Sequence, residues 1–195
     1  AVAPTVQCEW TGPAANDPTA KFTEIYTSPM VADLNLDLDP KKIQPSVVVT
    51  TFASPNNRTG MLRVFDGRTC QEQMRIGGPD DPDAASNRPG YVGGLAIGDL
   101  DGDVGTKGGH PEIVGMHRIG LDDGDDPAQV IAFGIDSQDP EKPKLVRRWL
   151  GRDCANKDKA VVFSNNADSA SLGLALHDLD DDGVPEVIAD TMVFD

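Results

Sequence analysis

Short runs that combine apolar and β-branched residues with isolated polar ones recur along the chain, each bounded by turn-forming residues. Four such runs, six to eight residues long, lie at 61–67, 71–76, 129–136 and 144–150. That length and composition are typical of β-strands. The 20 Gly and 15 Pro residues favour many short elements joined by turns. The chain is therefore predicted to be all-β, and no segment of it is predicted to be helical.

One pattern, an apolar stretch followed by an acidic loop and a β-branched run, occurs three times, in segments that begin at residues 29, 94 and 173. The leading acidic residues of the loops, Asp33, Asp99 and Asp178, are 66 and 79 residues apart. A proline follows the leading Asp after 12 residues in the first two segments and after 7 in the third. Because two copies share this expansion at the same place, the segments are interpreted as copies of one supersecondary unit.

Further strand-like runs after the first two loops complete units of four short strands, which is typical of β-propeller blades. The predicted architecture is a partial β-propeller with about three four-stranded blades. A sandwich with long loops explains the strands but not the copied acidic loops. The expected division is an N-terminal segment (1–28), a first blade (29–78), a linker (79–91), a second blade (92–151), a linker (152–171) and an incomplete third blade (172–195).

Three blades are fewer than the usual minimum of about four for a closed propeller. The run 191–195 corresponds to RVFDG at 63–67 but has no fourth strand after it. The segment Val6–Trp10 has the pattern of an outer strand that could complete another blade. Unpaired strand edges invite association unless they are covered. We therefore expect the remaining blades to come from additional polypeptide, either the same precursor or associated chains.

The acidic loop of the third segment has the residue types and spacing of a calcium-binding loop. Carboxylates stand at relative positions 1, 3, 5 and 9, and Gly183 at position 6 allows a sharp turn. Carboxylate and carbonyl oxygens that point to one centre are the ligands that Ca²⁺ prefers. The predicted ligands are Asp178, Asp180, Asp182, Glu186 and the carbonyl of Val184. An EF-hand is excluded because its closing Glu stands at position 12 and helices flank it.

The second loop keeps the first half of this pattern. Asp99, Asp101 and Asp103 are in register with the third loop, whereas Glu112 can return to the ion only if the inserted residues bulge outward. Without a cation, several carboxylates so close together would repel one another strongly. The second loop is therefore a further predicted calcium site.

The first loop departs furthest from the pattern. Ser46 stands where the closing Glu is expected. The candidate ligands are Asp33, Asn35, Asp37 and Asp39. Because this loop offers the least charge, it is predicted to bind Ca²⁺ most weakly.

These loops resemble the FG-GAP or VCBS repeats of integrin-α-like β-propellers. The resemblance is closest at DLDDDGVPEV (178–187), and RVFDG (63–67) is similar to the end of the family's third strand. It covers about residues 29–195 and implies a propeller, usually of about seven blades, with Ca²⁺ in loops between adjacent strands of a blade. It also implies an extracellular or cell-surface location and a role in adhesion or ligand binding.

Charge narrows the classes of partner. The chain has 32 acidic and 17 basic residues and a net charge of −15. Such a surface repels phosphate backbones and anionic membranes, so no nucleic-acid partner is expected. No apolar run is long enough to span a bilayer. Oxygen sites with low calcium affinity suit the millimolar calcium found outside cells, so an extracellular, cell-surface or periplasmic location is predicted.

The three cysteines, Cys8, Cys70 and Cys154, form no Cys-x-x-Cys motif, which argues against a zinc or redox site. The sequence is compatible with one disulfide and one free thiol, and also with three free thiols. Cys8 is the expected partner in any disulfide, because its predicted strand would lie on an outer blade edge.

The predicted function is a non-catalytic, calcium-binding scaffold for adhesion or for binding a protein or glycan ligand. The alternatives are a carbohydrate-active enzyme on a propeller frame, such as a polysaccharide lyase or hydrolase, and a lectin. No catalytic motif supports an enzyme, and His110, His117 and His177 are interpreted as surface or loop residues. A lectin needs exposed aromatic side chains, whereas Trp10 and Trp149 are expected to occupy strand positions in the core.

Overall fold

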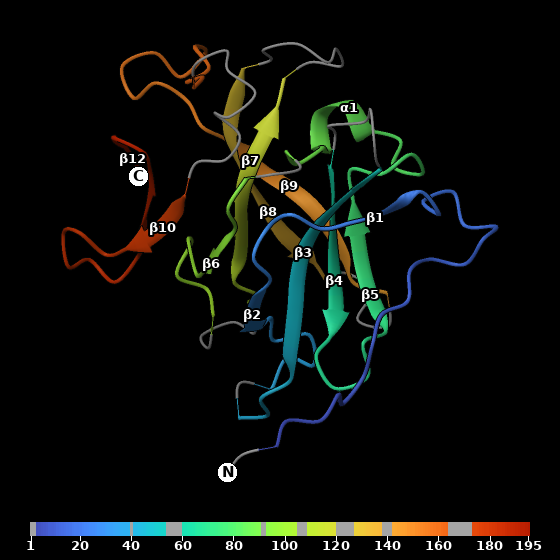
Figure 1. Ribbon diagram of the computed structural model, residues 1–195. Helices are drawn as coiled ribbons and strands as arrows, with labels where there is room; N and C mark the ends of the chain where they lie inside the picture. Colours follow the sequence, from blue (N-terminus) through green and yellow to red (C-terminus); the bar gives the residue numbers. More distant parts are fainter. Residues whose placement is uncertain are drawn as a thin grey trace.

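Antiparallel β-sheets form almost all of the regular structure in the computed structural model (Figure 1). The structure describes residues 3–39, 41–53, 60–90, 93–104, 109–119, 127–137, 142–163 and 173–195. The all-β class is thereby confirmed. A single helical turn, α1 (Ala84–Asn87), lies in the stretch predicted to be a linker. Within the described ranges, no helix is long and apolar enough to cross a membrane.

The first sheet contains the strands of the first repeat: β1 (Phe22–Glu24), β2 (Met30–Asp33), β3 (Pro45–Ala53), β4 (Gly60–Asp66) and β5 (Glu72–Ile76). A run of Val and Thr at 47–51 favours the long central strand β3. β1 pairs with the C-terminal end of β3 and β2 with its N-terminal end. The two short strands therefore share one edge of β3. The predicted strands at 61–67 and 71–76 correspond to β4 and β5.

The second sheet repeats this arrangement. Its strands, in spatial order, are β6 (Ala96–Gly98), β7 (Glu112–Arg118), β8 (Ala128–Asp136) and β9 (Lys144–Leu150). Pro89 bridges to His117 on the same edge of β7 that pairs with β6. The edge of β7 therefore has a partner in two parts, as the edge of β3 does. The predicted strands at 129–136 and 144–150 correspond to β8 and β9.

The third sheet is smaller and consists of β10 (Leu174–His177), β11 (Glu186–Ala189) and β12 (Met192–Phe194). Its first two strands are antiparallel, with His177 opposite Glu186. In all three sheets the acidic loop connects such an antiparallel pair: β2 with β3, β6 with β7, and β10 with β11. The copied sequence segments therefore occupy equivalent places in the three sheets.

The second sheet is packed on both of its faces. One core cluster joins it to the first sheet and includes Val64 and Phe133, and another joins it to the third sheet and includes Val130 and Val187. Successive residues of β8 alternate between the two clusters, as the two-residue period of a strand requires. This explains why β8 is an almost continuous apolar run. Trp149 of β9 packs against the second cluster, as predicted.

Residues 3–21, named here the N-terminal strap, lie against the other face of the first sheet. The side chains of Leu62 and Val64 point toward the second sheet, so those of Arg63 and Phe65 point the opposite way. The Trp10 ring lies against Phe65, with 5.0 Å between ring centroids. Trp10 is half-buried but outside any strand, so its predicted strand position was wrong.

Arg63 connects the strap to the sheet. Its guanidinium is fully buried and lies 5.3 Å from the centroid of the Trp10 ring. It donates hydrogen bonds to the hydroxyls of Thr51 (3.0 Å) and Thr19 (2.8 Å) and forms an ion pair with Glu72. A buried charge needs this number of partners to offset its lost hydration. The strap therefore contributes directly to the packing of the first sheet.

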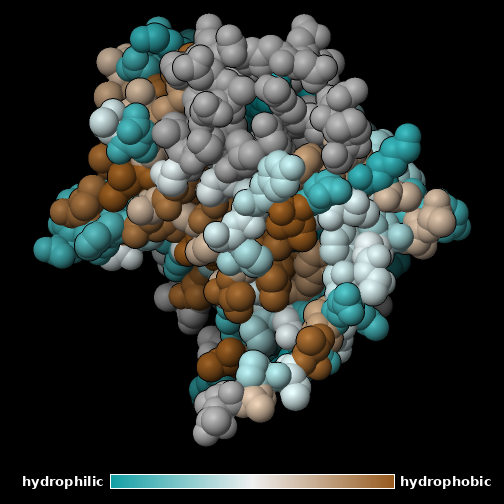
Figure 2. Space-filling model, viewed as in Figure 1, coloured by the Kyte–Doolittle hydropathy of each residue, from teal (hydrophilic) through white to brown (hydrophobic). Residues whose placement is uncertain are grey.

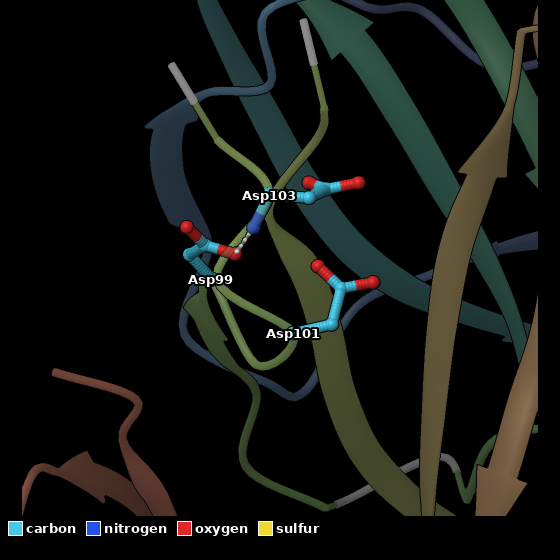
Figure 3. Close-up of side chains that lie close together, drawn as sticks. All are labelled: Asp99, Asp101 and Asp103. Carbon is cyan, nitrogen blue, oxygen red and sulfur yellow. Dashed lines mark hydrogen bonds between the residues drawn. The ribbon is translucent and has the colours of Figure 1, made fainter. Parts of the chain in front are cut away.

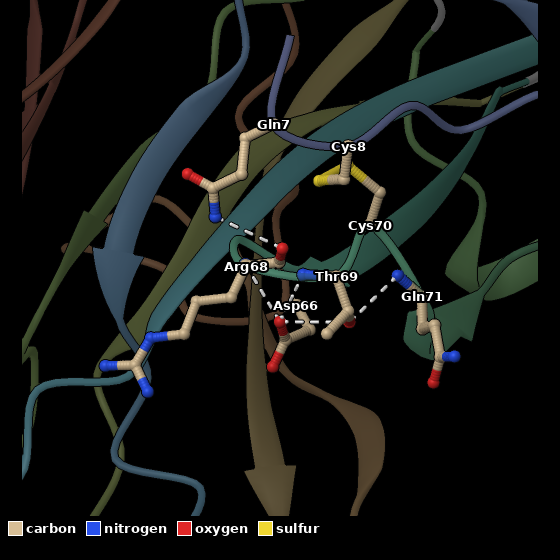
Figure 4. Close-up of a disulfide and its surroundings, with 7 residues drawn as sticks. All are labelled: Gln7, Cys8, Asp66, Arg68, Thr69, Cys70 and Gln71. Carbon is tan, nitrogen blue, oxygen red and sulfur yellow. Dashed lines mark hydrogen bonds between the residues drawn. A yellow bond between two sulfur atoms is a disulfide. The ribbon is translucent and has the colours of Figure 1, made fainter.

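A disulfide between Cys8 and Cys70 fixes the beginning of the strap (Figure 4). Cys154 is exposed and unpaired, so the alternative of one disulfide and one free thiol is the one observed. Cys8 was the expected partner, but the reason given for it was wrong. The segment Val6–Trp10 is irregular and forms no outer strand, since its residues cross the sheet face and do not extend a sheet edge.

Candidate metal sites

The acidic loops of the second and third repeats have the same hydrogen bonds at their leading residue. Asp99 accepts hydrogen bonds from the backbone N–H groups of Asp103 (3.0 Å) and Val104 (3.1 Å). Asp178 accepts them from Asp182 (3.1 Å) and Gly183 (2.9 Å). In both loops the donors follow four and five residues after the leading Asp. The leading carboxylate therefore holds each loop in a closed turn.

The closing glutamates also occupy equivalent positions. The backbone N–H of Leu100 donates to Glu112 (3.0 Å), and that of Leu179 donates to Glu186 (2.6 Å). In each loop the donor directly follows the leading Asp. The contact is therefore the same in both loops despite the five-residue expansion of the second, and the predicted bulge at 105–108 lies outside the described residues.

Positive φ angles occur at equivalent points of the two loops. Gly102 (φ 68°) and Asp181 (φ 61°) both stand at relative position 4, and Gly183 (φ 93°) stands at position 6 as expected. Only glycine adopts this left-handed conformation freely, although Asp and Asn tolerate it better than other residues. Position 4 was not recognised from the sequence, because an Asp gives no clear signal for a left-handed residue.

In the second loop, Asp99, Asp101 and Asp103 each offer an oxygen, and these oxygens all lie within 4.8 Å of one another (Figure 3). Burial, and then the charges of Asp101 and Asp99, raise the pKa of Asp103, while His110 opposes the rise. Glu112 is buried and binds the Leu100 N–H, and it is not part of this group. The structure therefore brings together three of the four predicted ligands.

In the third loop, Asp178, Asp180 and Glu186 form the corresponding group, again with oxygens within 4.8 Å. The carboxylate of Asp182 lies outside this group and accepts a hydrogen bond from the Val184 N–H (2.8 Å). Oxygen-only clusters of this kind suit hard divalent cations. Both loops can therefore hold a cation, which would relieve the repulsion between their carboxylates.

The first loop is organised differently. Its carboxylates accept hydrogen bonds from nearby backbone N–H groups. Asp33 accepts from the N–H of Asn35, and Asp37 accepts from the N–H of Asp39. Hydrogen bonds from the Lys42 ammonium and then from the Asp39 N–H lower the pKa of Asp37. In the part of the chain that the structure describes, no third group of clustered ligands occurs here. The predicted order of affinities, with this loop last, stays a prediction.

The three loops are neighbours. The side chain of Asn35 in the first loop donates to the Gly109 carbonyl in the expansion of the second (2.7 Å). A β-carbon built on Gly102 of the second loop would lie 3.6 Å from Val184 of the third. The acidic loops therefore lie consecutively at one end of the stacked sheets.

Two of the three histidines are buried: His110 lies in a loop, as predicted, whereas His117 lies in a strand, contrary to the prediction. His117 lies inside β7, opposite Gln129, and its Nδ1 is 2.8 Å from the Arg88 carbonyl. Burial lowers the pKa of His117. His110 is buried where the second loop meets the first sheet. The sequence places His110 in the expanded loop and His117 just beyond a strand, and only the packing of the sheets buries them.

Replacement of Glu112 by Gln is expected to remove a pH-dependent loss of stability in metal-free protein. Burial, opposed by the Leu100 hydrogen bond and aided by Asp101 and Asp103, raises the pKa of Glu112 to about 7. The folded state then binds more protons than the unfolded state above the ordinary Glu pKa, so stability falls as the pH rises toward and through 7. The loss is on the order of 2–3 kcal/mol.

Urea unfolding of both proteins in chelator, between pH 4.5 and 8, measures this difference. Glu112→Gln should be flatter and more stable than the wild type at pH 8. The variant Glu24→Gln, at an exposed position of β1, serves as the control. Parallel pH profiles for wild type and Glu112→Gln would contradict the prediction.

Comparisons with known proteins identify no relative, since no protein-family model, no curated protein and no solved structure matches this chain.

Proposed function

We propose that the chain is a non-catalytic calcium-binding scaffold whose second and third acidic loops take Ca²⁺. The observation that carries this proposal is the shared geometry of two loops 79 residues apart. In both, the leading Asp closes the turn and three carboxylate oxygens lie within 4.8 Å. A solvated turn has no need for such a repeated cluster of like charges.

Calcium is favoured over other cations by the ligands. The clustered groups in the third loop are all carboxylates, which excludes a preference for soft metals. The loop is short and partly exposed, so its geometry can adjust to six to eight oxygens, with water completing the shell. Magnesium demands a stricter octahedron, which an adjustable loop of this kind does not impose.

The scaffold is proposed to be part of a β-propeller. Stacking of the sheets face to face supports this proposal, as does the position of β6 between the neighbouring strands β2 and β10. The strap covers the free face of the first sheet, so further blades would add beyond the third sheet. Hydrophobic side chains gather at the surface there (Figure 2), among them Met192 and Val193.

An extracellular, cell-surface or periplasmic location is part of the same proposal. The Cys8–Cys70 disulfide supports it, because such bonds persist mainly in oxidising compartments. Millimolar calcium in those compartments would keep exposed, weakly tuned oxygen sites occupied.

Calcium is expected to raise the free energy of unfolding. Asp178→Asn or Asp180→Asn should remove the part of this stabilisation that the third loop contributes. A ligand that binds only the folded state contributes about 2.7 kcal/mol per site at a concentration of 100 Kd. Calorimetric titration gives the number of bound ions, and thermal melts with calcium and with chelator give the stabilisation. Asp158→Asn removes an exposed carboxylate outside the loops and is the matched control.

The wild type and Asp158→Asn should bind at least two ions, and the loop variants one ion fewer. A melting temperature that is the same in calcium and in chelator would refute the proposed function. Unchanged stoichiometry in Asp180→Asn would show that the third loop is not a site.

A further inference from the structure

Gly109 is the point where the first and second acidic loops meet. Its carbonyl accepts the hydrogen bond from Asn35 Nδ2 (2.7 Å). A β-carbon built on Gly109 would lie only 1.6 Å from Asp103 Oδ1, so the carboxylate of Asp103 fills the space that the glycine leaves. Asn35 from the first loop and Asp103 from the second therefore converge on the same residue.

His110 follows Gly109 and is 6% exposed. Its Nδ1 lies 2.9 Å from the Leu34 carbonyl, which can only accept, so Nδ1 carries the proton and the neutral ring presents a bare lone pair at Nε2. Among the described residues, Nε2 has no hydrogen-bond partner. His110 is also close enough to Asp103 to influence the pKa of that carboxyl, which burial and the charges of Asp101 and Asp99 chiefly raise.

Asn35 presents a second acceptor of this kind. The side chain is 5% exposed, and its bond to the Gly109 carbonyl identifies the donating atom as Nδ2. The remaining oxygen, Oδ1, is buried and has no hydrogen-bond partner among the residues that the structure describes. Buried acceptors without partners are destabilising, because they lose their hydration and gain no hydrogen bond in return.

His110 lies outside the group of Asp99, Asp101 and Asp103, so the acceptors that matter here are those around Gly109. A cation satisfies buried acceptors better than water does. Asn35 Oδ1, His110 Nε2 and the Asp103 carboxylate all accept, and a water molecule has only two protons to donate. A metal-bound histidine typically donates its other ring N–H to a backbone carbonyl, which is the arrangement of His110 with Leu34.

We propose that the second acidic loop is a mixed nitrogen and oxygen metal site that spans two sheets, in which His110 Nε2 and Asn35 Oδ1 join the carboxylate of Asp103. This inference rests on the proposed function in one respect, namely that the loop holds a divalent cation. It adds to that function a ligand set that also accepts transition metals. An imidazole ligand gives this loop affinity for metals such as Zn²⁺ in addition to Ca²⁺, whereas the third loop, with carboxylates only, keeps its preference for Ca²⁺.

Binding of Mn²⁺ to the whole chain, followed by electron spin echo spectroscopy, tests the proposal. Mn²⁺ bound to the wild type should show modulation from a directly coordinated ¹⁴N, and labelling of the histidines with ¹⁵N should change it. His110→Gln should lose the nitrogen signal, and its Mn²⁺ affinity should fall by about tenfold or more. His177→Gln removes the exposed histidine beside Asp178 and should change neither property.

Bound Mn²⁺ without nitrogen modulation, or a nitrogen signal that survives in His110→Gln, overturns the inference while calcium binding by the third loop still stands. The labelled wild type gives this answer even if His110→Gln does not fold. A chain that binds neither Mn²⁺ nor Ca²⁺ overturns both the inference and the proposed function.

Discussion

Removal of the Cys8–Cys70 disulfide is expected to lower the free energy of unfolding by about 4 kcal/mol. The bond joins residues 62 positions apart, so reduction frees a long loop in the unfolded chain. It also releases the beginning of the strap, which covers Arg63 and Phe65 through Trp10. Urea unfolding of the double variant Cys8→Ala/Cys70→Ala measures the loss.

Cys154→Ser is the matched control for the disulfide, because that thiol is exposed and unpaired. It should unfold at the same urea concentration as the wild type. If the double variant lost no more than this control, the strap would not be a stabilising part of the fold.

Glu72→Gln is expected to cost about 2–3 kcal/mol, less than the loss of the disulfide, because Glu72 itself is partly exposed. The variant keeps the size of the side chain but removes the negative partner of the fully buried Arg63. Glu72 also pairs with Arg75 at 3.2 Å, so its loss leaves two guanidinium groups near each other. Arg63 would then keep two hydroxyls, the Trp10 ring and the charge of Asp17, with a neutral amide oxygen in place of the carboxylate.

The same unfolding experiment measures this cost, with Glu24→Gln as the control at an exposed position of the same sheet. Glu72→Gln should also make the strap more susceptible to proteolysis, since Arg63 holds Thr19. A loss as small as that of the control would mean that Arg63 is hydrated or paired in another way.

Much of the regular structure could be predicted from the sequence alone. The β-branched and apolar runs at 61–67, 71–76, 129–136 and 144–150 form strands because their local composition and their packing on the sheets favour the same conformation. The copied acidic segments predicted copied loops. The equivalent hydrogen bonds of Asp99 and Asp178 follow from this repetition, because each involves only residues within the same loop.

Only the tertiary structure decided which residues the loops share. The sequence predicts that Asn35 is a ligand of the first loop, but its side chain contacts Gly109, 74 residues later. The burial of His110 and His117 was not predicted, because it depends on the neighbouring sheet and not on local pattern. The strap was likewise misread in part as an outer strand, since its position depends on contacts with Cys70, Phe65 and Arg63. Local chemistry determined the strands and the acidic turns, whereas contacts between distant segments determined burial, the disulfide and the junction between loops.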